Sequence, residues 1–181
     1  RVVHSGRYHF ITNRCLAGQY LLRPDDESIR IILGVLAKAV ADHNVEMVCF
    51  VFMSNHFHLI CGFPDANMAE FMSQLTSQLA KRLNKLRGRR GPMFPRRYHD
   101  QVLMDEVALL KQIKYVVNNP VKDELVETAE EWPGVTSIEA RLGDGTVTGE
   151  WRNGVVYNRL KQKDHGQHQG GIQIRKQGSE R

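Results

Sequence analysis

The sequence has no apolar stretch long enough to cross a membrane. Its longest apolar run, Met47 to Met53, is far short of the roughly 20 residues that a membrane-spanning helix needs. The first residues also lack the order of basic, apolar and small-residue regions that marks a secretory signal peptide. We therefore expect a cytoplasmic location and no membrane partner.

Cysteine is scarce and is not arranged for disulfides or for a zinc site. Cys15, Cys49 and Cys61 are odd in number, form no CxxC pair and lie in apolar segments. This pattern is typical of reduced, buried thiols. No internal repeat is visible, and 181 residues with 41% hydrophobic content can bury one good core. One compact domain with an extension is the expected organisation.

Positive charge is present but unevenly placed. The net charge is only +5, yet one segment holds eight basic residues and no acidic ones. These residues are Lys81, Arg82, Lys85, Arg87, Arg89, Arg90, Arg96 and Arg97. Gly88, Gly91, Pro92 and Pro95 interrupt the run, which favours a mobile basic arm over a solvated helix face. Such an arm can neutralise backbone phosphates, so nucleic acid is the leading partner class.

The hydrophobic periodicity predicts an α+β fold. We expect strands over 8–15, 46–53, 56–61 and 97–104 and helices over 28–44, 67–88 and 105–117. Ser28 is expected to open the first helix and Asp105 to cap the third, while Pro120 ends the third. This order is the split βαββαβ pattern of a ferredoxin-like sandwich with one helix added.

The signals weaken after Trp132-Pro133. Turn residues surround 146–148, a short strand or helix is possible over 151–160, and 164–181 is expected to be polar and mobile. Trp151 and Tyr157 are expected either to stack on bases or to fold back on the core. This irregular C-terminal extension spans 138–181, after a first domain over 1–137.

Two histidines share one face of a predicted strand. Side chains alternate along a strand, so His56 and His58 point to one side while Phe57 points to the other. Two imidazoles on one face are half of a metal site, although chance His-x-His pairs are common. The surrounding strand is apolar, and burying two polar rings without partners is costly. This context favours a metal site.

Tyr115 is the candidate nucleophile. Asn119 lies four residues later and Lys111 four residues earlier, so the three project from nearly the same side of the helix, with Lys114 adjacent. A phenol needs a positive environment or a polarised electrophile to attack at neutral pH. The alternative is a tyrosine packed on the sheet with its hydroxyl capped.

Both motifs resemble those of a known family. The string 53–60, MSNHFHLI, resembles the HUH signature of the single-tyrosine HUH transposases, in which U is a bulky hydrophobic residue. The string 115–122, YVVNNPVK, followed by Leu125-Val126 and Glu131-Trp132-Pro133, is similar to the tyrosine helix of the REP-associated tyrosine transposase branch. The match runs from about Tyr8 to Ser137, with the motifs in the right order.

The resemblance implies a ferredoxin-like nuclease that cuts and rejoins single-stranded DNA, often beside a hairpin. It assigns His56 and His58 as metal ligands and Tyr115 as the nucleophile that forms a covalent 5′-phosphotyrosine. The position of the family's third polar ligand is Asn119, whose carbonyl oxygen suits Mg²⁺ or Mn²⁺. No nucleotide cofactor is implied. Lys111 and Lys114 join the eight basic residues above as DNA-binding candidates.

Two other readings compete with an active DNA-cleaving enzyme. One is a catalytically quiet DNA- or RNA-binding module that keeps the fold. The other is a metal-dependent hydrolase without covalent catalysis, for which no carboxylate cluster is evident. The sequence also leaves open whether the protein acts as a monomer or as a homodimer with exchanged helices.

Overall fold

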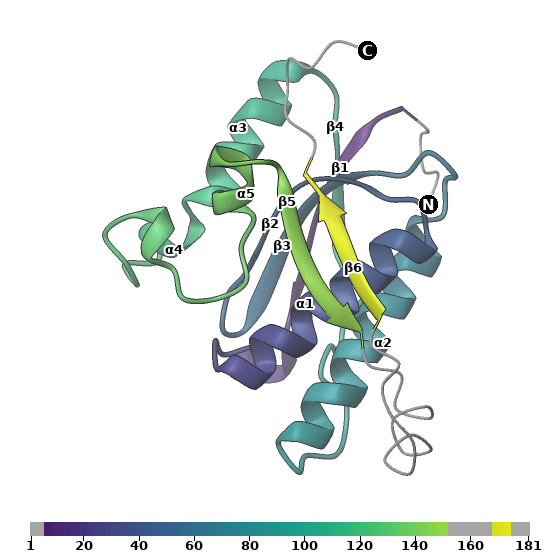
Figure 1. Cartoon of the computed structure of the whole chain (residues 1–181), viewed down its shortest axis with the longest axis vertical. Coiled ribbons are helices and arrows are strands. Elements are labelled where there is room, and N and C mark those ends of the chain that lie inside the picture. The colour runs from purple at the N-terminus through teal and green to yellow at the C-terminus, as the bar shows by residue number, and fades with distance from the viewer. Residues whose placement is uncertain (1–5, 152–167, 175–181) are drawn as a thin grey trace.

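The fold is built on a four-stranded antiparallel sheet in the order β2-β3-β1-β4 (Figure 1). A computed structural model describes residues 6–151 and 168–174. The strands are β1 (Tyr8–Arg14), β2 (Glu46–Phe52), β3 (His56–Gly62) and β4 (His99–Leu103). The strand order and the alternation with helices confirm the predicted ferredoxin-like sandwich.

Helices cover both faces of the sheet. The helices α1 (Asp26–Asp42) and α2 (Met68–Leu86) pack with Ile11, Phe57 and Leu59 in one buried cluster. The opposite face carries a second cluster, in which α3 (Glu106–Val117) packs on β2 and β3. Alternate residues of β3 therefore enter different cores, as the period of a strand requires.

The helix ends follow local capping chemistry. Asp105 caps α3 as predicted, because its side chain accepts a hydrogen bond from Ala108 N at 2.7 Å. The prediction that Ser28 opens α1 is wrong. Asp25 is the cap, and its carboxylate accepts from Ser28 N at 2.9 Å. Ser28 thus lies inside the first turn.

The chain turns once more after α3. The helix ends at Val117, and the short α4 (Asn119–Lys122) follows directly. Pro120 is tolerated there because the first helical turn needs no backbone donor. As a result, Asn119 begins a new turn rather than ending the tyrosine helix.

The C-terminal extension is more regular than the sequence indicates. The elements of this extension are α5 (Ile138–Leu142), β5 (Thr146–Trp151) and β6 (His168–Gln173). Two 3₁₀ turns lie earlier in the chain, η1 (Leu16–Gly18) and η2 (Ala129–Glu131). The residues expected as a turn at 146–148 start β5, because Thr-Val-Thr is a β-branched run. The prediction of a mobile tail over 164–181 is wrong for residues 168–174, which include β6. The rest of that tail, and Tyr157, lie outside the described residues.

The β5–β6 hairpin lies across α1 (Figure 1). Gly34 on α1 and Gly149 on β5 permit this approach. A Cβ on Gly34 would overlap the Glu150 carbonyl oxygen, and one on Gly149 would overlap the Leu33 carbonyl oxygen. Ile172 of β6 is fully buried in the same core as α1. The hairpin is thus part of the packed structure.

The expectations about cysteine are also met. Cys15, Cys49 and Cys61 are free and buried. Burial raises the pKa of the Cys15 and Cys49 thiols to about 12, so both are neutral at physiological pH. Across residues 6–151 and 168–174, no helix is both long and apolar enough to cross a membrane.

Replacing Gly34 with alanine should loosen the β5–β6 hairpin. The added methyl group meets backbone at Glu150, which cannot rotate away, so we expect the free energy of unfolding to fall by about 1–3 kcal/mol. Urea denaturation measures this change. Gly171→Ala is the matched control, because its Cβ would meet only Thr146 Cγ2 at 3.8 Å. Equal stability of the two variants would contradict the close packing.

Candidate active site beside strand β3

His56 and His58 lie side by side at the start of β3. Their ring centroids are 4.8 Å apart, and the rings meet nearly at right angles. His58 pairs across the sheet with Thr12 of β1 and Val51 of β2. The predicted placement of both histidines on one strand face is therefore confirmed.

Tyr115 reaches this histidine pair from α3 of the same chain. Its ring centroid is 5.5 Å from that of His58, in an edge-to-face arrangement. Phe10 stacks on His58 at 5.4 Å and meets the Tyr115 ring edge-on at 6.0 Å. These aromatic contacts fix the ring of Tyr115 beside the histidines. The two sequence motifs thus form one site within one chain.

A cation that the sequence analysis did not single out lies over Tyr115. Lys122 of α4 places its Nζ 4.7 Å from the centre of the tyrosine ring. The two predicted lysines, Lys111 and Lys114, are exposed on α3. To place Lys122 beside Tyr115 from the sequence, the helical periodicity would have to continue past Asn118. Pro120 predicts instead that the helix ends there.

Asn119, the expected third ligand, lies beside His56. It is 2% exposed, and its Oδ1 lies 3.2 Å from His56 Nε2. The other ring nitrogen, Nδ1, is 2.7 Å from Oδ1 of Asn55. Asn55 in turn donates from Nδ2 to the Gly18 carbonyl oxygen at 3.2 Å, which fixes the orientation of its amide.

This network sets the tautomer of His56. Because Asn55 Oδ1 is an acceptor, His56 Nδ1 carries the proton and donates to it. A neutral His56 then directs the lone pair of Nε2 toward Asn119 Oδ1, which is also an acceptor. A cation beside this pair would be bound by both lone pairs, whereas without one a turned Asn119 amide would donate to Nε2. The arrangement is suited to holding a cation.

His58 is buried and lacks polar partners. It is 5% exposed, and neither ring nitrogen has a hydrogen-bond partner among the described residues. Burial, together with the charges of the nearby His56 and Lys122, lowers the pKa of His58 to about 3. Burial also lowers the pKa of His56. Both imidazoles are therefore neutral at pH 7, the form that binds metal ions.

These donors fit a divalent cation. In the described ranges, no three His, Cys, Asp or Glu residues gather as a metal site. The site therefore depends on Asn119 as the third donor beside His56 and His58. The 3.2 Å between His56 Nε2 and Asn119 Oδ1 is close to the roughly 3 Å between neighbouring ligands of an octahedral Mg²⁺ or Mn²⁺. A nitrogen of His58, neither of which has a partner among the described residues, would supply the remaining donor.

The basic segment is not the mobile arm that the sequence predicts. Lys81, Arg82 and Lys85 belong to α2, and the chain that follows is anchored to the body of the protein. Arg87 donates to Asp25 Oδ2 at 3.2 Å and to Ser28 Oγ at 3.0 Å. The prediction failed because these partners lie far away in the sequence.

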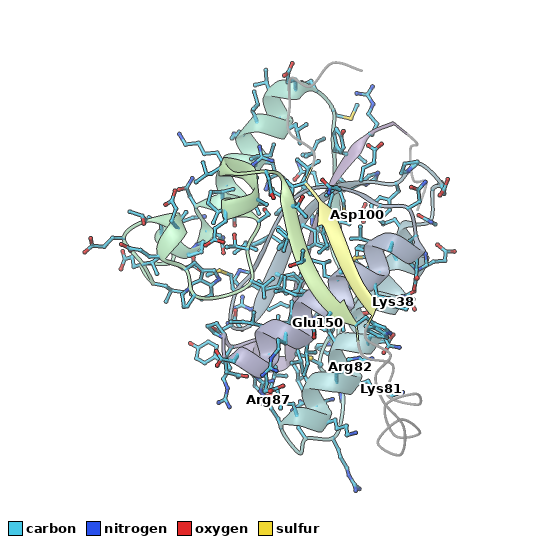
Figure 2. All side chains as sticks on the ribbon, in the orientation of Figure 1. Lys38, Lys81, Arg82, Arg87, Asp100 and Glu150 are labelled. Atoms are coloured by element: carbon cyan, nitrogen blue, oxygen red, sulfur yellow. The ribbon has the colours of Figure 1, made fainter. Side chains whose placement is uncertain are left out.

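Two further contacts hold this segment. The Met93 carbonyl accepts from Leu16 N at 2.9 Å, and Arg89 donates to the Pro92 carbonyl at 3.1 Å. Arg82 stacks on the Trp151 ring at 3.8 Å, near the end of β5 (Figure 2). Trp151 therefore folds back on the protein. Five of the eight basic residues remain exposed, namely Lys81, Lys85, Arg90, Arg96 and Arg97.

Comparison with known proteins agrees with the motifs and the fold. No family model matches the chain. A curated relative from Haemophilus influenzae, named "Putative REP-associated tyrosine transposase", is 27% identical over 99 residues, 49% of this chain. The match covers 56% of that relative, a little over half its length.

A solved structure of a REP-associated tyrosine transposase bound to a REP hairpin has the same fold. It matches 80% of this chain and 84% of its own at a TM-score of 0.68, with 18% sequence identity. The chain thus shares the mixed α+β fold of that structure. The resemblance to the REP-associated tyrosine transposases is confirmed.

The buried histidines should make the metal-free protein sensitive to acid. The pKa of His58 is about 3 in the folded chain and roughly 6.5 in the unfolded chain, so only the unfolded chain binds a proton between these values. The stability is fully present above about pH 6.5 and is lost as the pH falls toward 3. We expect a loss of about 1 kcal/mol per pH unit, measured by urea denaturation in EDTA. His58→Gln should flatten this dependence; an unchanged slope would contradict the burial.

Proposed function

We propose that the chain is a transposase-like endonuclease that cleaves and rejoins single-stranded DNA through a covalent 5′-phosphotyrosine on Tyr115. The observation that carries this proposal is the position of the Tyr115 ring, 5.5 Å from His58 and in the same chain. Asn119 lies beside His56 on the same side of the sheet. The nucleophile and the cation-binding donors therefore border one site.

The proposed reaction is a transesterification. The Tyr115 hydroxyl loses its proton as its oxygen attacks the scissile phosphorus, and the bond from phosphorus to the 3′ oxygen breaks. The products are a 5′-phosphotyrosine and a free 3′-hydroxyl. One phosphodiester replaces another, so attack by a 3′-hydroxyl can reverse the step and join strands.

The residues of the site have separate parts in this reaction. His56, His58 and Asn119 are proposed to bind Mg²⁺ or Mn²⁺, and Asn55 orients His56 through its Nδ1 proton. When bound, the cation supplies electrostatic stabilisation of the phosphate charge in the transition state. Lys122, which lies over the Tyr115 ring, adds positive charge where the phenolate develops.

The proposed substrate is a DNA single strand next to a hairpin. The solved relative is bound to a REP hairpin, and we propose the same class of DNA for this chain. The exposed basic residues around α2 and the start of β4 match a polyanionic partner. A single chain is proposed to suffice for cleavage, because Tyr115 already contacts its own His58.

The site favours an enzyme over a quiet binding module. Neither nitrogen of His58 has a partner in the described part of the chain, although burying them costs free energy. A protein that only bound DNA through its surface would gain nothing from this cost. Cation binding at His58 offsets it and gives the buried imidazole a role.

The covalent step can be trapped directly. With Mg²⁺ or Mn²⁺, 5′- and 3′-labelled hairpin DNA with single-stranded flanks should give an SDS-resistant adduct with the wild-type protein. Tyr115→Phe removes the attacking oxygen, so the adduct should fall below detection. Tyr20→Phe is the matched control, because Tyr20 is 70% exposed and is not part of the site. An adduct that survives in Tyr115→Phe would refute the assignment.

Cation binding can be measured without turnover. Titration with Mn²⁺, followed by calorimetry or by the loss of the free Mn²⁺ electron spin resonance signal, should show one site. His58→Ala and Asn119→Leu should each weaken binding at least about tenfold, because each removes a ligand. Asn119→Asp should retain binding, since a carboxylate oxygen replaces the amide oxygen. His43→Gln is the control, because His43 bonds Gln74 away from the site. Equal affinity of all variants would exclude this metal site.

A further inference from the structure

The sheet face that carries the histidines continues beyond them onto β1 and β4. In the antiparallel pairing of β1 with β3, Arg14 lies opposite His56 and Thr12 lies opposite His58. Residues directly opposite each other in such a pair share a face. Arg14 and Thr12 therefore lie on the same face as the proposed ligands.

The next strand extends this face with two more polar residues. In the pairing of β1 with β4, His99 lies opposite Thr12, and Gln101 lies opposite Phe10. Phe10 stacks on His58, which places its side chain on the face of the site. We call the four residues Thr12, Arg14, His99 and Gln101 the polar stripe.

The polar stripe is open to solvent. Arg14, His99 and Gln101 are exposed and Thr12 is partly exposed, whereas Phe10, His58, Ile60 and Leu103 on the same face are buried. Helix α3 packs chiefly on β2 and β3, so it covers the apolar half of the face and leaves the polar half free. The stripe thus begins at the histidines, on the side of the site away from β2.

The charge of this face suits a phosphate backbone. No acidic residue of β1 or β4 shares the face of the stripe, as the register shows. Asp100 points to the other face, where its Oδ2 lies 3.8 Å from the fully buried His9. Arg96 and Arg97 are exposed just before β4. A negatively charged strand therefore meets no repulsive side chain of β1 or β4 along the stripe, and the acidic residue that acts on the histidines is Asp123, after α4.

Arg14 lies opposite His56 in the sheet and acts on it electrostatically. Its side chain forms no hydrogen bond or ion pair with any residue that the structure describes. Its guanidinium lies near Gly18, the residue whose carbonyl also holds Asn55. A planar guanidinium with several free donors binds a phosphate in two places at once. Packing within the protein does not account for the unpaired guanidinium of Arg14, whereas phosphate binding does.

We propose that the polar stripe is the track for the single-stranded DNA that flanks the scissile phosphate, with Arg14 binding the phosphate next to it. This inference rests on the proposed function, since it takes the Tyr115 site as the point of cleavage. Thr12, His99 and Gln101 then offer uncharged or weakly basic hydrogen-bonding groups to the strand as it crosses β1 and β4.

The test measures binding separately from cleavage. All variants are made in Tyr115→Phe, so the DNA stays intact, and the probe is a fluorescein-labelled hairpin with mixed-sequence single-stranded flanks. Fluorescence anisotropy gives Kd over a range of salt. Arg14→Gln should weaken binding about tenfold and lower the slope of log K against log salt by about 0.7, the value for one phosphate contact on a single strand. Arg30→Gln is the control, since Arg30 pairs with Glu27 on α1, which covers the opposite face.

A charge placed further along the stripe tests its extent. Gln101→Glu keeps the shape of the side chain and adds one negative charge, so binding of the flanked hairpin should weaken about fivefold. Gln173→Glu makes the same change on β6, in the hairpin that lies across α1, and should leave Kd unchanged. Circular dichroism melts of each variant should match the parent, which separates a lost contact from a lost fold.

The outcomes distinguish this inference from the proposed function. If Arg14→Gln binds like its parent while the wild-type protein forms the adduct, the polar stripe is wrong and the proposed function stands. If Arg14→Gln weakens binding but the wild-type protein forms no adduct, Arg14 binds DNA but the proposed cleavage at Tyr115 fails, and with it the stripe as a track to a scissile phosphate. If Arg14→Gln weakens binding equally to a blunt hairpin without flanks, Arg14 contacts the stem and the inference is overturned.

Discussion

The packing of α3 on the histidine face of the sheet is the contact on which the site depends. The period of β3 places His56 and His58 on that face, but only α3 brings Tyr115 to them. Phe10 joins the two, because its ring contacts both His58 and Tyr115. The same helix leads into α4, which places Asn119 and Lys122. One helix–sheet interface thus brings together the proposed nucleophile, a proposed ligand and the cationic Lys122 side chain.

That interface is stable without a large polar network because most of it is apolar. Val116 of α3 is fully buried in the same apolar cluster as Val48 and Val51 of β2. On the other face, α1, α2 and the β5–β6 hairpin form a separate core. The segment that follows α2 is fastened to this second layer through Arg87 and Asp25, and Arg82 of α2 itself packs on Trp151. One face therefore carries the proposed site, and the other holds the basic residues of α2 and of the segment after it.

Much of the fold and part of the site could be predicted from local sequence. Alternation along β3 set the histidine face, and Asp105 marked the start of α3. The predictions of a mobile arm and of a mobile tail at 168–174 were wrong. Contacts between residues that are far apart in the sequence fix both segments, through Arg87 in the first and Ile172 in the second. Lys122 and Arg14 were missed for the same reason. Tertiary packing determines both the helical turn at Pro120 that places Lys122 and the strand register that places Arg14. The metal ligands and the DNA-binding residues stay predictions.

The central claim is that His58 and Tyr115 of one chain act together. Mixing two inactive variants, Tyr115→Phe and His58→Ala, tests it most directly, with labelled hairpin DNA and Mn²⁺ and with wild-type protein as the positive control. Because the Tyr115 ring lies 5.5 Å from His58 of its own chain, neither variant can complete the site of the other, and the mixture should form no SDS-resistant adduct. An adduct restored by mixing would show that the tyrosine of one chain serves the histidines of another, and would contradict this account.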